Sequence, residues 1–165
     1  MKVILNLDEV PLEQGAEGTR FAAATGEFGV LLGLYGLGAA LHIVQPGKTA
    51  TPFHRHHTSD EMFLVLSGSG TYRYGNDRLP FRTGDCLSAP AGAEGHQIIN
   101  TGTEELRYIA FSNNTNADVV EYLDSGRIRV DVGAVGHHRE NATFGAGGKL
   151  TPMGYWDGED TGGEK

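Results

Sequence analysis

Cysteine is nearly absent from this chain of 165 residues, which contains only Cys86. One cysteine excludes a disulfide within the chain, as is usual in a reducing compartment. Cys86 follows Gly84-Asp85 in an apolar run, so we expect a buried and unreactive thiol. The first residues, MKVILNLDEVPLEQG, contain one lysine and no cleavage-like small-residue site. We therefore expect no signal peptide and a cytoplasmic protein.

Long apolar runs and concentrated positive charge are also missing. The longest apolar stretch, residues 29–44, is interrupted by glycines and contains His42, which argues against a membrane-spanning helix. Thirteen Lys and Arg residues are scattered singly among 21 Asp and Glu residues, for a net charge of -8. Phosphate backbones require a concentrated basic surface. We expect neither nucleic acid nor a membrane as a partner.

Helical periodicity is absent from residues 31–112, and short strand-like runs take its place. Runs such as LHIVQ, EMFLVLS, TYRY and LRYIAFS are separated by turn residues at intervals of about eight to twelve positions, and the chain contains 25 glycines. This spacing predicts an all-β sandwich or barrel. We expect one domain over residues 1–165, with a conserved barrel at about 40–112.

Two arms flank this barrel in the prediction. The N-terminal arm, residues 1–30, includes KVILNL as a candidate first strand. The C-terminal extension, residues 113–165, begins with two expected strands, VVEYL and RIRVDV, around the turn residues Asp124-Ser125-Gly126. From Gly133 on we expect an extended tail in which Tyr155-Trp156 is the obvious anchor.

The segment His54-Arg-His56-His57-Thr-Ser-Asp-Glu61 has the composition of a metal site. On a strand, His54 and His56 point to the same face, about 7 Å apart along the chain. Glu61 has the opposite parity, but Thr58-Ser59-Asp60 is turn chemistry, so Glu61 can begin a new strand and face the same interior. A carboxylate at the head of an apolar strand is costly unless it is paired or binds a cation. The alternative is a rim residue bonded to Arg55 or to a nearby lysine.

A second segment, from Gly84 to Asn100, returns a histidine toward the first pair. A strand enters the turn Pro90-Ala-Gly92, and His96 begins the next strand. A lone histidine on an apolar face is usually a core residue. This one follows a turn-strand-turn of the right length to lie beside His54 and His56, which favours a ligand.

These residues resemble the two motifs of the cupin superfamily. Gly47, His54, His56, Glu61 and Gly68 match the first motif, and Gly84, Pro90, Gly92, His96 and Asn100 match the second, each with one extra residue before a histidine. The resemblance implies a double-stranded β-helix, the jelly-roll or cupin barrel, with His54, His56, Glu61 and His96 as metal ligands. Less specifically, VVEYLDSGRIRV and GYWDGE are similar to small bacterial single-domain cupins that are sometimes labelled sugar-phosphate isomerases.

Three functions remain open from the sequence. Three imidazoles and a carboxylate suit one divalent Zn, Fe, Ni, Co or Mn ion. Such an ion could support isomerisation of a small polar carbonyl or sugar-like compound, or dioxygenation with iron. It could also anchor a small molecule in a protein that is not an enzyme. Because Glu61 is a poor base while it ligates, Tyr72, Tyr74 or a water would move the proton.

The remaining histidines are expected to lie outside the ligand set. His57 should face the surface or an interface, or replace His56 if the chain bulges. His42 is expected to line the core or a pocket, and His137-His138 to be solvated. EMFLVLS is apolar on both faces, which predicts a homodimer or cover from one of the arms.

Overall fold

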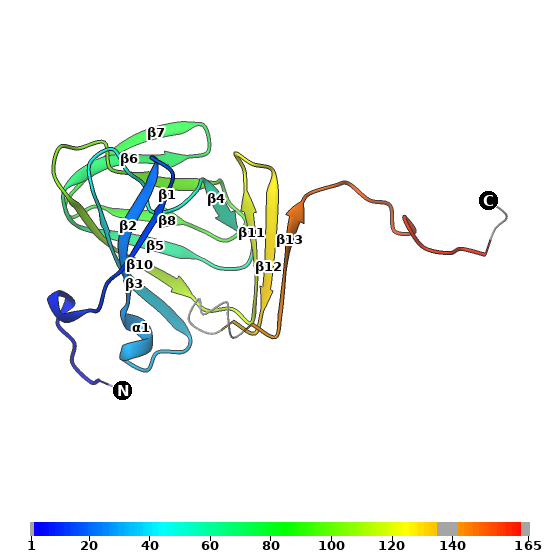
Figure 1. The fold of residues 1–165 in the computed structure, drawn as a ribbon, viewed down its shortest axis with the longest axis horizontal. Coiled ribbons are helices and arrows are strands. Elements are labelled where there is room, and N and C mark those ends of the chain that lie inside the picture. Colours follow the sequence, from blue (N-terminus) through cyan, green and yellow to red (C-terminus); the bar gives the residue numbers. More distant parts are fainter. Residues whose placement is uncertain (1, 135–141, 163–165) are drawn as a thin grey trace.

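The computed structural model describes residues 2–134 and 142–162, and β-structure dominates both ranges (Figure 1). The helical elements are a 3₁₀ turn, η1 (Leu7–Glu9), and one short helix, α1 (Phe28–Leu31). None of the helices in these ranges is long and apolar enough to cross a membrane. The predicted all-β class is confirmed. The strands are β1 (Glu13–Glu17), β2 (Phe21–Glu27), β3 (Leu37–Val44), β4 (His54–His56), β5 (Glu61–Ser67), β6 (Ser69–Tyr74), β7 (Asp77–Arg82), β8 (Cys86–Ala89), β9 (His96–Ile99), β10 (Leu106–Asn113), β11 (Ala117–Tyr122), β12 (Arg127–Val132) and β13 (Phe144–Lys149).

The strands form two antiparallel sheets that face each other (Figure 1). One sheet has the order β1-β2-β3-β10-β5-β8, and the other has the order β13-β12-β11-β4-β9-β6-β7. Successive strands of the chain therefore alternate between the sheets at β3 to β6 and again at β8 to β10. This winding brings β4 and β9, which are 40 residues apart, into direct pairing at His54 and His96.

The main core lies between the sheets. Side chains alternate faces along a strand, so Phe63 and Val65 of β5 point inward together with Tyr108 of β10. They pack with Tyr72 and Ile98 from the opposite sheet. This core lies directly beside the polar interior residues, since the ring of Phe63 is 5.5 Å from that of His96.

A second apolar cluster covers the outside of the six-stranded sheet. Leu41 and Ile109 point outward and pack against Val10 and Phe28, with Leu66 at the edge of the cluster. The N-terminal arm thus covers part of the outer face that EMFLVLS presents, although Met62 stays 43% exposed. The arm is not separate from the barrel, because β2 pairs with β3 and extends the sheet.

The prediction of KVILNL as a first strand is wrong. Val3 and Ile4 are 85% and 88% exposed, and Leu7 already belongs to η1. Asn6 caps that turn by accepting a hydrogen bond from the Asp8 backbone amide at 3.0 Å. This local cap competes with strand pairing, and the first strand begins at Glu13.

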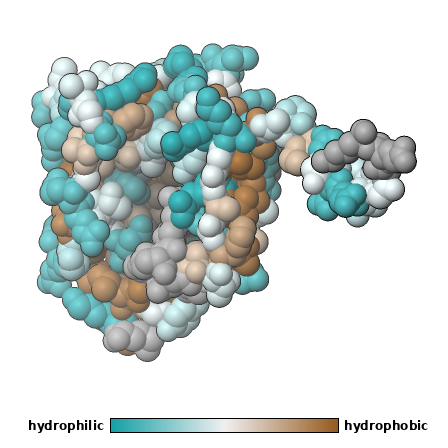
Figure 2. Space-filling model, turned by 45° about the vertical axis from the view of Figure 1, so that its right-hand side comes forward, coloured by the Kyte–Doolittle hydropathy of each residue, from teal (hydrophilic) through white to brown (hydrophobic). Residues whose placement is uncertain are grey.

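The C-terminal extension adds three strands to the seven-stranded sheet. β11 and β12 match the predicted VVEYL and RIRVDV. The expectation of an extended tail from Gly133 on is wrong over Phe144–Lys149, where β13 pairs with β12 and continues the meander. The expected anchor is wrong: Tyr155 and Trp156 are 87% and 66% exposed and contact each other. The tail stands away from the body in Figures 1 and 2. Its sequence has too few aliphatic residues to hold it against the barrel.

The prediction of a buried Cys86 is also wrong, because this residue is exposed. β8 lies at the edge of its sheet and alternates strictly, with Leu87 and Ala89 pointing inward and Cys86 and Ser88 outward. The apolar residues that follow Cys86 in this strand, Leu87 and Ala89, are the ones that point inward, so they do not indicate burial of Cys86 itself.

Candidate metal centre

His54 and His56 project from the same face of β4 into the barrel. The two residues pair with Tyr122 and Val120 of β11, and both are buried. β4 ends at His56 and β5 begins at Glu61, so the chain breaks its alternation at residues 57–60. Because of this break, Glu61 and the two histidines face the same interior despite their opposite parity in the sequence.

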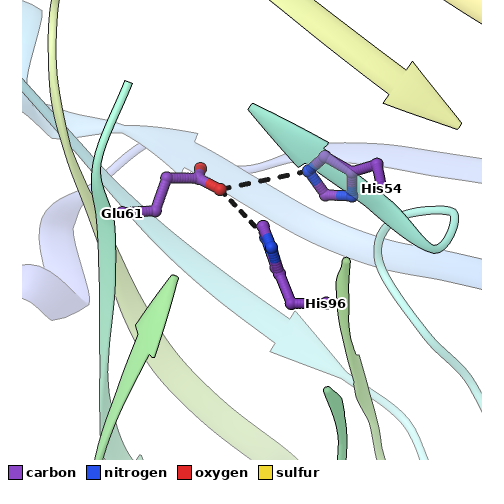
Figure 3. Close-up of side chains that lie close together, drawn as sticks. All are labelled: His54, Glu61 and His96. Atoms are coloured by element: carbon purple, nitrogen blue, oxygen red, sulfur yellow. Dashed lines mark ion pairs between the residues drawn. The ribbon is translucent and has the colours of Figure 1, made fainter. Parts of the chain in front are cut away.

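The three imidazoles converge on one carboxylate oxygen. Glu61 Oε2 lies 3.0 Å from His96 Nε2, 3.4 Å from His56 Nε2 and 4.0 Å from His54 Nε2. The ligand atoms of His54, Glu61 and His96 all lie within 4.8 Å of one another. Figure 3 shows the carboxylate of Glu61 pointing between the rings of His54 and His96. The three residues belong to three different strands, β5, β4 and β9.

Two of these converging atoms find no partner outside the cluster. Glu61 Oε2 and His96 Nε2 are buried, and apart from the ion-pair contacts among the ligands themselves neither has a hydrogen-bond partner. A buried polar atom without a partner costs about 1–3 kcal/mol, more when it is charged. Three imidazole nitrogens around a carboxylate oxygen are the donors that a divalent transition metal prefers. The residues therefore fit a metal ion.

The protonation states also suit a metal site. Burial first, and then the neighbouring His96, lower the pKa of His54 to about 4, although Glu61 acts to raise it. Burial acts to raise the pKa of Glu61, but the surrounding imidazoles, His96 first, bring it down to about 2. A neutral imidazole beside a carboxylate is the form in which both groups bind a cation.

Two of the histidines are oriented by hydrogen bonds at their other ring nitrogen. His54 Nδ1 donates to the Pro52 carbonyl at 2.8 Å, which leaves Nε2 as the acceptor nitrogen. His56 Nδ1 lies 2.7 Å from Asp118 Oδ2, in the arrangement of a carboxylate that orients a metal-binding histidine. Asp118 belongs to β11, in the C-terminal extension. No local sequence signal marks Asp118 as a partner of His56, because 62 residues separate the two.

The residues between and beside the ligands face away from the barrel. Arg55 donates to Glu121 on β11 at 2.7–2.8 Å, and His57 Nε2 lies 3.1 Å from the same carboxylate. The alternative reading, in which Glu61 bonds to Arg55, is wrong because strand alternation puts Arg55 on the outer face. His57 lies at the surface, as predicted, with a side chain that is 38% exposed.

A cavity of about 160 Å³ opens beside the candidate ligands. His54, His56 and Glu61 form one wall. His42 lines the cavity as predicted, with Nδ1 3.2 Å from Thr25 Oγ1 and its ring stacked on Tyr108 at 5.0 Å. The remaining lining residues come mainly from β2, β3 and β10: Glu27, Gly38, Ala39, Ala40, Thr51, Ala110, Phe111 and Ser112.

Tyr72 and Tyr74 do not line this cavity. Tyr72 is buried in the core and donates its hydroxyl to the Ser88 carbonyl at 2.9 Å. Burial raises the pKa of Tyr72, as do the negative charge of Glu61 and the neighbouring Tyr74. Both tyrosines border a separate groove beside β7 and β8. His137-His138 lies outside the described residues.

Known proteins resemble this chain in both sequence and structure. Residues 40–112 match the family described as "Cupin domain". A candidate sugar phosphate isomerase from Acidithiobacillus ferrooxidans is 30% identical, with a TM-score of 0.72 over 78% of this chain and 86% of that one. A cupin-superfamily sugar phosphate isomerase from Silicibacter pomeroyi has a TM-score of 0.75 over 94% of both chains at 21% identity, a likeness of fold.

A plant protein also matches. Auxin-binding protein 1 of Arabidopsis thaliana is 28% identical over 134 residues, which are 75% of this chain and 65% of that protein. The chain thus spans slightly less than two thirds of this relative. The domain match, the structural neighbours and the two facing antiparallel sheets agree with the resemblance in the motifs. The fold is a double-stranded β-helix, and the chain belongs to the cupin superfamily.

Proposed function

We propose that this cupin holds one divalent transition-metal ion through His54, His56, Glu61 and His96. The observation that supports the proposal is the convergence of three imidazole Nε2 atoms within 4.0 Å of one buried carboxylate oxygen. Glu61 Oε2 and His96 Nε2 are buried with no hydrogen-bond partner outside this cluster, which supplies a reason for a cation at this point. Zn, Fe, Ni, Co and Mn all accept this donor set.

We further propose that the site is an enzyme centre that isomerises a small polar carbonyl or sugar-like compound. When bound, a divalent ion would act as a Lewis acid on the oxygens of such a compound. The cavity beside the ligands provides room for such a compound, and side chains that line the cavity would transfer the proton. His42 lines that cavity, and its ring is held in place by the contact with Thr25 Oγ1 and by stacking on Tyr108. An imidazole exchanges protons near neutral pH, so His42 replaces Tyr72 as our candidate for this step.

One observation favours a second function, a binding protein without catalysis. Auxin-binding protein 1 is named for the molecule that it binds, and it is 28% identical to this chain over 134 residues. A bound ion could anchor a carboxylate or hydroxyl of a small molecule without further chemistry. Dioxygenation with iron is a third reading of the same ligands.

Metal analysis of the protein, purified without added ions, tests the site. We expect about one equivalent of a transition metal in the wild type, and loss of most of it in His96→Ala. His57→Ala is the matched control, because His57 adjoins His56 but lies on the outer surface. Equal metal content in wild type and His96→Ala would overturn the site.

The identity of the metal then separates the three functions. Iron together with oxygen uptake would favour the dioxygenase. Zinc, nickel, cobalt or manganese with turnover of a hydroxy-carbonyl compound would support the isomerase. Stoichiometric metal with saturable binding of small molecules and no turnover would support the binding protein.

A further inference from the structure

The two strands that carry the histidines meet in a very short pairing. β4 and β9 are neighbours in the seven-stranded sheet, and their register contains one pair of residues, His54 and His96. On their other sides, β4 pairs with β11 over three residues and β9 pairs with β6 over four. The backbone ladder therefore does little to set the distance between these two candidate ligands, whose ring centroids lie 4.5 Å apart. We call this junction between β4 and β9 the seam.

The residues that precede the two histidines pack on each other at the seam. Phe53 precedes His54, and Gly95 precedes His96. A methyl group on Gly95 would lie 2.9 Å from the Phe53 ring and 2.6 Å from the Leu123 side chain, so the ring lies directly against the Gly95 backbone. Phe53 is 5% exposed, and its carbonyl accepts a hydrogen bond from the Leu123 amide at 3.1 Å. The position of this ring thus helps to fix how closely the two strands approach.

One arginine spans the seam and contacts this ring. Arg73 Cζ lies 3.5 Å from the centroid of the Phe53 ring, and Nη1 and Nη2 donate to the two carboxylate oxygens of Asp124 at 2.7 and 2.8 Å. Arg73 belongs to β6, the partner of β9, whereas Asp124 lies just beyond the end of β11, the partner of β4. The bidentate bond therefore joins the strands on either side of the seam, with the guanidinium stacked on Phe53. We call Arg73, Phe53 and Asp124 the clamp.

The burial of Arg73 distinguishes it from an ordinary surface ion pair. Its side chain is 19% exposed, and its Nε is buried with no hydrogen-bond partner among the residues that the structure describes. A buried donor without a partner is unfavourable, so the packing on Phe53 and the two bonds to Asp124 must compensate for it. Exposed pairs contribute little to stability, whereas a bidentate, stacked guanidinium has a fixed geometry. Such a geometry suits a group that positions other residues.

We propose that Arg73 is a positioning residue of the metal centre: through the clamp it sets the separation of His54 and His96. The inference rests on the proposed metal site and adds to it a residue that neither of the two cupin motifs contains. Ligands that are held at the right separation before the ion arrives bind it more tightly, because less conformational freedom is lost on binding.

Cobalt binding tests the proposal, because the visible absorption of bound Co²⁺ reports both the occupancy of a site and the geometry of its ligands. Co²⁺ is titrated into the metal-free, full-length protein in competition with a chelator, after circular dichroism has shown that each variant is folded. Arg73→Lys keeps the charge but lacks the planar fork that binds a carboxylate at two points and stacks on a ring. We expect this variant to bind Co²⁺ ~10-fold more weakly and with an altered absorption band, as for other groups that orient metal ligands.

Two further variants separate positioning from general stability. Asp124→Asn removes a charge from the clamp at a side chain that is 51% exposed, so it keeps the proposal testable if Arg73→Lys does not fold. We expect Asp124→Asn to weaken Co²⁺ binding as well, and to add little when it is combined with Arg73→Lys, because both residues act through one bond. Arg107→Lys is the matched control. Arg107 is bound to Asp8 at 3.0 Å but lies on β10 in the other sheet, and we expect a change of less than about twofold.

Hydrogen exchange in the metal-free protein provides a readout at the seam itself. We expect the Leu123 amide, which donates to the Phe53 carbonyl, to exchange faster in Arg73→Lys than in the wild type. Faster exchange with unchanged Co²⁺ affinity and spectrum would make Arg73 a purely structural residue and overturn the proposal. Unchanged Co²⁺ binding in folded Arg73→Lys and Asp124→Asn, or an equal loss in Arg107→Lys, would overturn it as well. A wild type that binds no Co²⁺ would instead overturn the metal proposal, and this inference with it.

Discussion

Asp118 is expected to control metal affinity without touching the metal. Its Oδ2 lies 2.7 Å from His56 Nδ1, while its Oδ1 accepts hydrogen bonds from Thr58 at 3.1 Å and Ser59 at 3.4 Å. The carboxylate is thus held in place from two sides. It fixes the tautomer and orientation of His56 and makes Nε2 a stronger donor to a cation. Asp118→Asn keeps the shape of the side chain and removes its charge.

The size of the effect follows from the type of hydrogen bond. A hydrogen bond to a charged group contributes about 1.5–3 kcal/mol, and one between neutral groups about 0.5–1.5 kcal/mol. The loss of about 1–1.5 kcal/mol corresponds to a ~10-fold weaker binding constant, since 1.4 kcal/mol is one factor of ten. Outer carboxylates of this kind typically change metal affinity by 10–100-fold.

Competition between the protein and a chromophoric zinc chelator measures this affinity. Glu121→Gln is the control, because Glu121 also belongs to β11 and also contacts a histidine, but on the outer face. We expect a loss of ~10-fold for Asp118→Asn and less than about twofold for Glu121→Gln. Equal affinities of wild type and Asp118→Asn, or equal losses in both variants, would refute the reasoning.

Four further predictions follow from the same structure. The metal-free protein should lose stability as the pH falls from about 6.5 to about 4, because burial lowers the pKa of His54 to about 4 and the unfolded chain takes up a proton that the folded chain refuses. The loss should continue from pH 4.5 toward about 2, because the unfolded chain protonates Glu61 from about pH 4.5 whereas its folded pKa is lowered to about 2. Melting temperatures that do not change between pH 7 and pH 4 would contradict the part assigned to His54, and those that do not change between pH 4.5 and pH 2 the part assigned to Glu61. Tyr72→Phe should reduce the free energy of unfolding by about 1 kcal/mol, through loss of the hydrogen bond to Ser88, and leave metal content unchanged, as urea denaturation and metal analysis can verify. Cys86 should react with a thiol reagent in the folded protein as fast as in urea, and Cys86→Ser should change stability by less than about 0.5 kcal/mol; slow labelling of the native protein would refute the exposed placement. Sedimentation at micromolar concentration should give the mass of a dimer, since the apolar side chains Met62 and Leu79 expose 43% and 47% of their surface. The mass of a monomer at this concentration would contradict the prediction.

The class of fold and the candidate ligands could be predicted from the sequence because both depend on local patterns. Turn residues between short apolar runs indicate many strands, and alternation along a strand puts His54 and His56 on one face. The break in alternation before Glu61 could also be predicted, because the turn residues Thr58-Ser59-Asp60 directly precede Glu61 in the sequence. The exposure of Cys86 could not be read in this way. It depends on β8 lying at the edge of its sheet, and the order of strands is not a local property.

The sequence alone therefore determined that this chain is a β-barrel with three histidines and a glutamate in the order of a cupin. Only the tertiary structure decided what surrounds them. Asp118 reaches His56 across 62 residues, and Glu27 faces the cavity because β2 pairs with β3 in one register and not another. Register and strand order minimise the free energy of the whole packed barrel, so no short window of sequence specifies them.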